Sequence, residues 1–131
     1  MDPEIMRLVY DEAIRNRHID EEKSKEILVA LNLLYPLESF SEEIKISLLC
    51  LACFGDERLS IAQHLLDHDA PAHIDAFNYA LIDRNYSIMD LLLEYGLIIS
   101  KEDVLHYYNR SLEIDDDIMS SWFAENFPQY I

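Results

Sequence analysis

Two cysteines are the first candidates for chemistry in this chain of 131 residues. Cys50 and Cys53 have the Cys-Xaa-Xaa-Cys spacing of redox motifs and of half a zinc site. Such chemistry requires thiolates, which form at helix N-termini or beside cations, and zinc requires a second pair of ligands. Both cysteines stand inside an apolar run, and the chain has no others. We therefore expect small core residues without a disulfide, cofactor or metal, as suits a reducing cytosol.

Two histidines form the next constellation. His64 and His68 have the i, i+4 spacing that places two imidazoles on one helix face, where they can share a zinc ion with acidic neighbours. No glutamate follows His64, so the metalloprotease signature is missing. His64 also aligns with Leu91 of a later, similar segment, and this favours an at least partly buried packing role for His64 over metal binding. We expect no metal site here, and keep a metal-binding or regulatory domain using His64 and His68 as the alternative hypothesis.

The acidic run 115–117 resembles a calcium ligand set only in composition. The alternating acids, central glycine and terminal glutamate of a calcium loop are missing, so helix capping explains the run. The chain has only two glycines, so it has no glycine-rich phosphate loop, and no Gly-Xaa-Ser-Xaa-Gly elbow is present. The sequence therefore predicts neither catalysis nor a cofactor.

These residues lie in a chain that repeats itself. The segment Ser60–Ala70 recurs as Ser87–Leu97, and a weaker copy runs over 117–127. Isoleucines at 61, 88 and 118 align as the second residue of the three copies, at spacings of 27 and 30 residues. One amphipathic unit per period of this size indicates stacked repeats, in which each apolar face is buried by a neighbour.

Helix signals divide the chain into about eight short helices. Few glycines and prolines and long segments of Leu, Ile, Glu and Asp favour an all-α fold. We predict one domain of four antiparallel pairs, namely residues 1–36, 37–70, 71–97 and 98–131. The expected helix starts are Asp2-Pro3, Asp20, Ser39 or Ser41, Glu57, Ser100 and Asp115 to Asp117.

The expected apolar stripes define the core. In the first helix they are Ile5, Met6, Val9, Ala13 and Ile14, and in the second they are Ile27, Leu28, Leu31 and Leu34. The third helix, 42–54, is apolar almost all round, which predicts a central buried element that ends at Gly55-Asp56.

Ala80–Leu97 resembles the second half of an ankyrin repeat. That half reads Ala-Ala, Gly-His, Ile-Val, Leu-Leu-Leu and Gly-Ala at fixed spacings, and the alignment needs no gap. Ala52–Ala70 matches more weakly, with one extra residue, and the N-terminal third is not covered. Arg84-Asn85 replaces the Gly-His turn, and Thr-Pro-Leu-His is absent. The resemblance therefore implies a degenerate ankyrin-like stack without clear β-hairpin fingers.

The same resemblance implies a function in protein contacts. A small inhibitor or adaptor suits a domain of this size, and analogy with small divergent ankyrin-like proteins favours a viral or intracellular-bacterial origin. We expect a cytoplasmic protein, or one delivered into a host cytosol, because the acidic N-terminus is unlike a secretory signal and no apolar run spans a bilayer.

The net charge of −16 limits the class of partner. A field of that sign repels nucleic acids and anionic membranes, and attracts a protein with a basic surface. An acidic mimic of nucleic acid is a third hypothesis. Five of the 10 basic residues lie within residues 1–25, so Arg7, Arg15 and Arg17 form the competing recognition element.

The ankyrin-like resemblance implies that the partner surface lies on the first helices of successive pairs, with the connections before them, and in this sequence acids stand beside tyrosines there. Such a surface suits Lys or Arg through hydrogen bonds and cation–π contact. The predicted residues are Asp75, Asn78, Tyr79, Asp83, Arg84, Asp103, His106, Tyr107, Asp115 and Asp116.

The C-terminal aromatic residues raise the question of assembly, since a terminal repeat needs a polar outer face. We expect Trp122 and Phe123 to fold back and Tyr130 and Ile131 to be partly exposed, in a monomer or homodimer.

Overall fold

The computed structural model describes residues 2–16, 18–54 and 58–131. These residues form eight α-helices, one short 3₁₀ helix and no strand, which confirms the predicted all-α fold. The α-helices are α1 (Pro3–Arg15), α2 (Glu21–Leu34), α3 (Glu42–Cys53), α4 (Leu59–Asp67), α5 (Ile74–Ile82), α6 (Tyr86–Glu94), α7 (Lys101–Glu113) and α8 (Asp117–Asn126).

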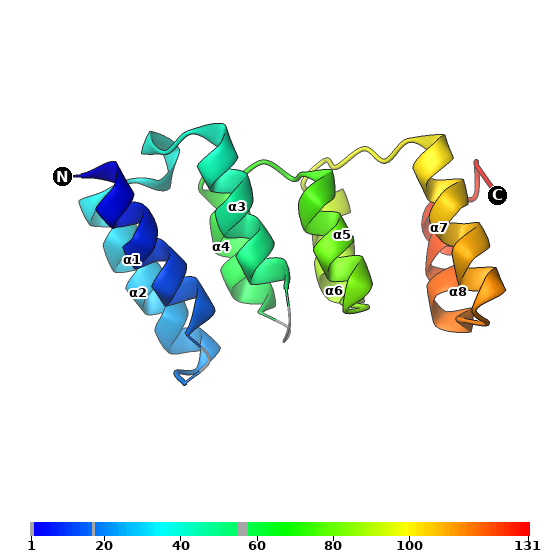
Figure 1. The fold of residues 1–131 in the computed structure, drawn as a ribbon, viewed down its shortest axis with the longest axis horizontal. Coiled ribbons are helices and arrows are strands. Elements are labelled where there is room, and N and C mark those ends of the chain that lie inside the picture. Colours follow the sequence, from blue (N-terminus) through cyan, green and yellow to red (C-terminus); the bar gives the residue numbers. More distant parts are fainter. Residues whose placement is uncertain (1, 17, 55–57) are drawn as a thin grey trace. The chain divides into compact units, whose positions relative to one another are not determined.

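The chain divides into two compact units, Met1–Leu97 and Ile98–Ile131. In the first unit, α1 packs on α2, α3 on α4 and α5 on α6. Helices α1, α3 and α5 form one layer and α2, α4 and α6 a second, as Figure 1 shows. The second unit is the pair α7 and α8, and it begins at the residue where the predicted fourth pair begins.

Side-chain caps begin most of the helices. The carboxylates of Asp2, Asp20 and Asp116 accept backbone N–H groups in the first turns of α1, α2 and α8. Ser41, rather than Ser39, caps α3, because Leu37–Ser39 forms the 3₁₀ helix.

Two predicted features fall in the connection between α3 and α4, at residues that the structure does not describe. The break at Gly55-Asp56 and the expected helix start at Glu57 lie outside the described residues, and α4 is seen from Leu59.

The core of the first unit centres on α3, which contacts α1, α4 and α5. The prediction of a central buried element is confirmed in part: Leu48 and Leu49 of α3 are buried, but Ser47 and Phe54, which ends the predicted helix, are exposed. A helix flanked by neighbours on three sides retains one open face.

Two other predicted stripes are confirmed in part. In α1, Met6, Ala13 and Ile14 are buried as predicted, but Ile5 and Val9 are exposed and Tyr10 is buried. In α2, Leu28 and Leu31 are buried, but Leu34 is exposed. Tyr10 can be buried because its hydroxyl donates a hydrogen bond of 2.8 Å to the Tyr35 carbonyl.

The repeat in the sequence is also a repeat in burial and backbone conformation. Ile61 and Ile88 are both fully buried. Asp69 and Gly96, which follow α4 and α6, both have positive φ, 82° and 94°. The two copies therefore form corresponding pieces of structure.

A buried arginine fastens α4 to the first helical pair. Arg58 is 4% exposed and donates hydrogen bonds to the carbonyls of Ile14 (2.6 Å) and Ile19 (3.4 Å) and to Ser24 Oγ (3.1 Å). The Glu21 carboxylate, on α2, accepts the Ser60 backbone N–H at 2.7 Å, and so caps α4 from another helix.

In the second unit the C-terminal aromatic residues fold back, as predicted. Trp122 and Phe123 are buried, and the Phe123 ring stacks on Tyr107 of α7 with centroids 5.8 Å apart. Tyr130 is half-buried and Ile131 is exposed, which confirms their predicted partial exposure.

Candidate functional site

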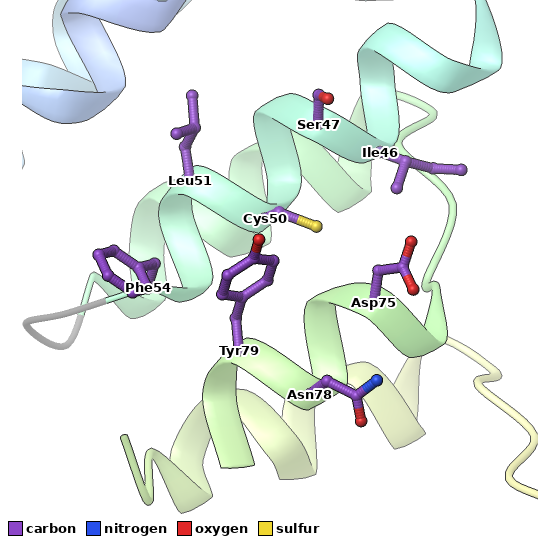
Figure 2. A pocket seen from close by; sticks show the side chains of 8 residues that line it. All are labelled: Ile46, Ser47, Cys50, Leu51, Phe54, Asp75, Asn78 and Tyr79. Carbon is purple, nitrogen blue, oxygen red and sulfur yellow. The ribbon is translucent and has the colours of Figure 1, made fainter. Parts of the chain in front are cut away.

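A groove of about 640 Å³ runs between α3 and α5 in the first unit. We call it the α3–α5 groove. Its lining residues are Ile46, Ser47, Cys50, Leu51, Phe54, Asp75, Asn78 and Tyr79. Figure 2 shows Asp75 and Tyr79 extending from α5 toward α3, with the Cys50 sulfur directed between them. The groove thus combines an apolar wall from α3 with a carboxylate, an amide and a phenol from α5.

The aromatic end of the groove is accessible and ordered by a ring contact. Phe54 is 54% exposed and Tyr79 is 41% exposed. Their centroids lie 5.7 Å apart with the ring planes at 89°, an edge-to-face contact that orients the Tyr79 ring. One exposed aromatic face is therefore available beside the Asp75 carboxylate.

The carboxylate of Asp75 lies beside the histidine that caps α5. His73 caps α5: its Nδ1 accepts the Asp75 backbone N–H at 3.0 Å and lies 3.6 Å from Asp75 Oδ2. The Asp75 carboxylate therefore lies in the first turn of α5, next to the capping histidine and within the groove.

The two cysteines are free. Burial first, and then the charge of Asp75, raises the pKa of Cys50 to about 11. Burial raises the pKa of Cys53 to about 12. Both groups are thiols at neutral pH, opposite to the thiolates that redox or zinc chemistry needs.

A second hollow of about 550 Å³ adjoins the α3–α5 groove. The two share Ile46, Ser47 and Asp75, and the second extends toward α1, where Arg7 lines it. Of the competing basic residues, Arg7 therefore lies near the candidate site, whereas Arg15 is paired with Asp11 at 2.6 Å. Arg17 lies outside the described residues.

The structure brings together three of the predicted partner residues, Asp75, Asn78 and Tyr79, in this groove. Asp83 is the C-cap of α5, and Arg84 follows it with a φ of 54°. Arg84 thus occupies, in the left-handed region, the turn where the ankyrin pattern has glycine.

The other predicted residues belong to the second unit. Asp103, His106 and Tyr107 lie on α7, and Tyr107 is half-buried against Phe123. Asp115 has a φ of 56°, and Asp116 caps α8 by accepting the Met119 N–H. Asp115 therefore forms part of a turn, and Asp116 is a helix cap.

The wall that α3 contributes was missed by the sequence analysis. The signal was present: residues 47, 50, 51 and 54 recur at the i, i+3, i+4, i+7 spacing of one helix face. Because the residues of this face are mostly apolar, the pattern resembles that of a fully buried helix.

The two candidate metal-binding histidines lie together at the C-terminal end of α4, where His68 is the C-cap. Their ring centroids are 4.4 Å apart, and His68 Nδ1 lies 3.6 Å from the Glu38 carboxylate and 3.3 Å from Asn32 Nδ2. Over the residues that the structure describes, no group of three or more His, Cys, Asp or Glu side chains is arranged to hold a metal ion. His64 is buried like Leu91, its counterpart.

His64 predicts a pH dependence of stability. Burial first, and then the charge of His68, lowers its pKa from the ordinary 6.5. As pH falls below 6.5, the unfolded chain binds a proton at His64 before the folded chain does, so the free energy of unfolding falls. His64→Leu and His64→Gln should both remove this component.

Urea denaturation between about pH 7.5 and about pH 5.5 measures the contribution of His64 to the pH dependence of the free energy of unfolding. Relative to either variant, the wild-type protein should lose stability as pH falls. The His64→Leu variant should in addition be more stable than the His64→Gln variant at every pH, because the corresponding buried position in the next copy holds a leucine, Leu91. Parallel pH profiles for all three proteins would contradict the role given to His64.

Comparison with protein-family models, with curated proteins and with solved structures finds no significant match. Within the described part of the chain, no helix combines the length and apolar character needed to cross a membrane.

Proposed function

We propose that this protein is a non-catalytic interaction module, a small inhibitor or adaptor, that docks on a basic surface of another protein. The observation that carries the proposal is the α3–α5 groove, in which Asp75, Asn78 and Tyr79 of α5 form one side and mostly apolar residues of α3 form the other. Interfaces favour tyrosine because it combines contact area with a hydroxyl at low entropic cost.

Charge supports the same class of partner. The net charge of −16 attracts a basic surface from a distance, and Asp75 is a carboxylate inside the groove itself. The layer of α1, α3 and α5 that bears the groove is the layer of first helices in a stack of helical pairs. The ankyrin-like resemblance of Ala80–Leu97 implies protein contacts on that layer, and remains part of the proposal.

The test selects random peptides displayed on phage against the whole protein. We expect enriched peptides to carry Lys or Arg together with apolar residues, and to bind more weakly at raised salt. Asp75→Lys should weaken the best peptide by about 1–3 kcal/mol, or roughly 5- to 150-fold. Glu94→Lys, an exposed site on α6 with the same change in charge, is the matched control.

Two results would contradict the proposal. One is enrichment of peptides without basic residues, whose binding is insensitive to salt. The other is equal loss of affinity in Asp75→Lys and Glu94→Lys, which would mean that only net charge matters. Circular dichroism of both variants verifies that the helices are retained.

A further inference from the structure

We infer that the α3–α5 groove binds an arginine side chain of the partner, with its guanidinium between the Asp75 carboxylate and the Tyr79 ring. The inference rests on the proposed function and specifies the chemical group that the groove recognises.

The spacing on α5 brings the two recognition groups together. Asp75 and Tyr79 are four residues apart and therefore lie on one helix face, and Figure 2 shows both extending toward α3. A guanidinium is planar, so it can stack on an aromatic ring while its N–H groups form paired hydrogen bonds with a carboxylate. An ammonium group acts as a point charge and cannot do both in this way.

Of the polar side chains that line the groove, Asp75 is the acceptor for a donor-rich group. Ser47 and Asn78 also line the groove, but in Figure 2 their side chains extend away from the space between Asp75 and Tyr79. Guanidinium has five N–H donors and no acceptor, so the N–H groups that do not reach Asp75 stay hydrated. Cys50, a neutral thiol, adds no charge that would compete with Asp75.

The apolar wall fits the remainder of the side chain. Ile46, Leu51 and Phe54 line the groove beside the polar groups. Arginine buries its methylene stem against apolar surface while its charged end reaches polar partners. We therefore expect an apolar residue of the partner next to the arginine.

Three capped tripeptides test the inference by NMR titration of the whole isotope-labelled protein. They are N-acetyl tripeptide amides with leucine on both sides of arginine, lysine or citrulline. Citrulline keeps the shape of arginine but has no charge. The arginine peptide should shift the amide signals of Ser47, Cys50, Asp75 and Asn78, and bind at least about fivefold more tightly than either of the others.

Variants locate the contact. Asp75→Asn and Tyr79→Leu should each weaken the arginine peptide at least about fivefold, whereas Tyr79→Phe, which keeps the ring, and the control Glu94→Gln should not. Equal affinity for the arginine and lysine peptides, or full affinity in Asp75→Asn and Tyr79→Leu, would overturn the inference. The dispersion of the amide spectrum verifies that each variant is folded.

The two experiments fail separately. If phage selection yields basic, salt-sensitive peptides but the arginine tripeptide leaves the groove signals unmoved, the proposed function stands and this inference is wrong. If the selected peptides lack basic residues while the arginine tripeptide binds, the groove has the inferred specificity but the proposed function is wrong.

Discussion

Replacing Arg58 with methionine should lower the free energy of unfolding by about 3 kcal/mol. The guanidinium of this buried residue bonds to Ile14 and Ile19 carbonyls and to the Ser24 hydroxyl, and its loss leaves these acceptors without that donor. Unsatisfied buried acceptors are more destabilising than the loss of an average exposed hydrogen bond. Urea denaturation followed by far-UV circular dichroism measures the change.

Arg15→Met is the matched control, because it removes the same charge from the same unit. Arg15 is exposed and its ion pair with Asp11 joins residues one turn apart on α1. Such a surface pair contributes at most about 1 kcal/mol. If the Arg58→Met variant is no less stable than the Arg15→Met variant, the guanidinium does not fasten α4 to the first pair.

Replacing Phe123 with alanine should destabilise the unit Ile98–Ile131 by about 3–5 kcal/mol. The Phe123 side chain is fully buried, and its ring contacts Tyr107, Trp122 and Phe127 at centroid distances of 5.8, 5.0 and 6.2 Å. A unit of two helices has few other large buried groups to compensate for the cavity. Because Trp122 is the single tryptophan of the chain, its fluorescence during denaturation reports on this unit.

Ile118→Ala serves as the comparison on the same helix. Ile118 is 71% exposed, so its truncation should change stability by no more than about 0.5 kcal/mol. A fluorescence transition that is unchanged in Phe123→Ala, or shifted equally in both variants, would show that the aromatic cluster is not the core of this unit.

Local signals made the helices predictable from the sequence. Caps such as Asp2, Asp20 and Ser100 act within one turn, so their effect can be inferred without knowing the tertiary fold. The alignment of His64 with Leu91 likewise indicated a packing role for a histidine, and His64 is buried.

Which face of a helix is covered depends on neighbours, and there the sequence was less informative. In α3 the apolar residues extend around the helix, so the open face with Leu51 and Phe54 has no polar stripe to mark it. In α1, Tyr10 rather than Val9 is buried because a carbonyl from residue 35 meets its hydroxyl. Such a partner is brought close only by the fold.

For the candidate site, residue type was a better guide than position. Acids beside tyrosines on the first helix of a pair led to the prediction of Asp75 and Tyr79, and both line the α3–α5 groove. The wall from α3 comes from a helix that precedes α5 by some 20 residues in sequence, and only the packing of α3 on α5 brings it there.

The layered packing of Met1–Leu97 also bears on how fast the unit folds. Its principal contacts join helices that are consecutive or separated by a single helix in the chain. Each contact therefore closes a short loop, and the entropy lost at each step is small. Chains with mostly local contacts fold quickly, on time scales of microseconds to milliseconds. Because α3 contacts the helices on both sides of it, we expect folding to begin there and to spread toward α1 and α5.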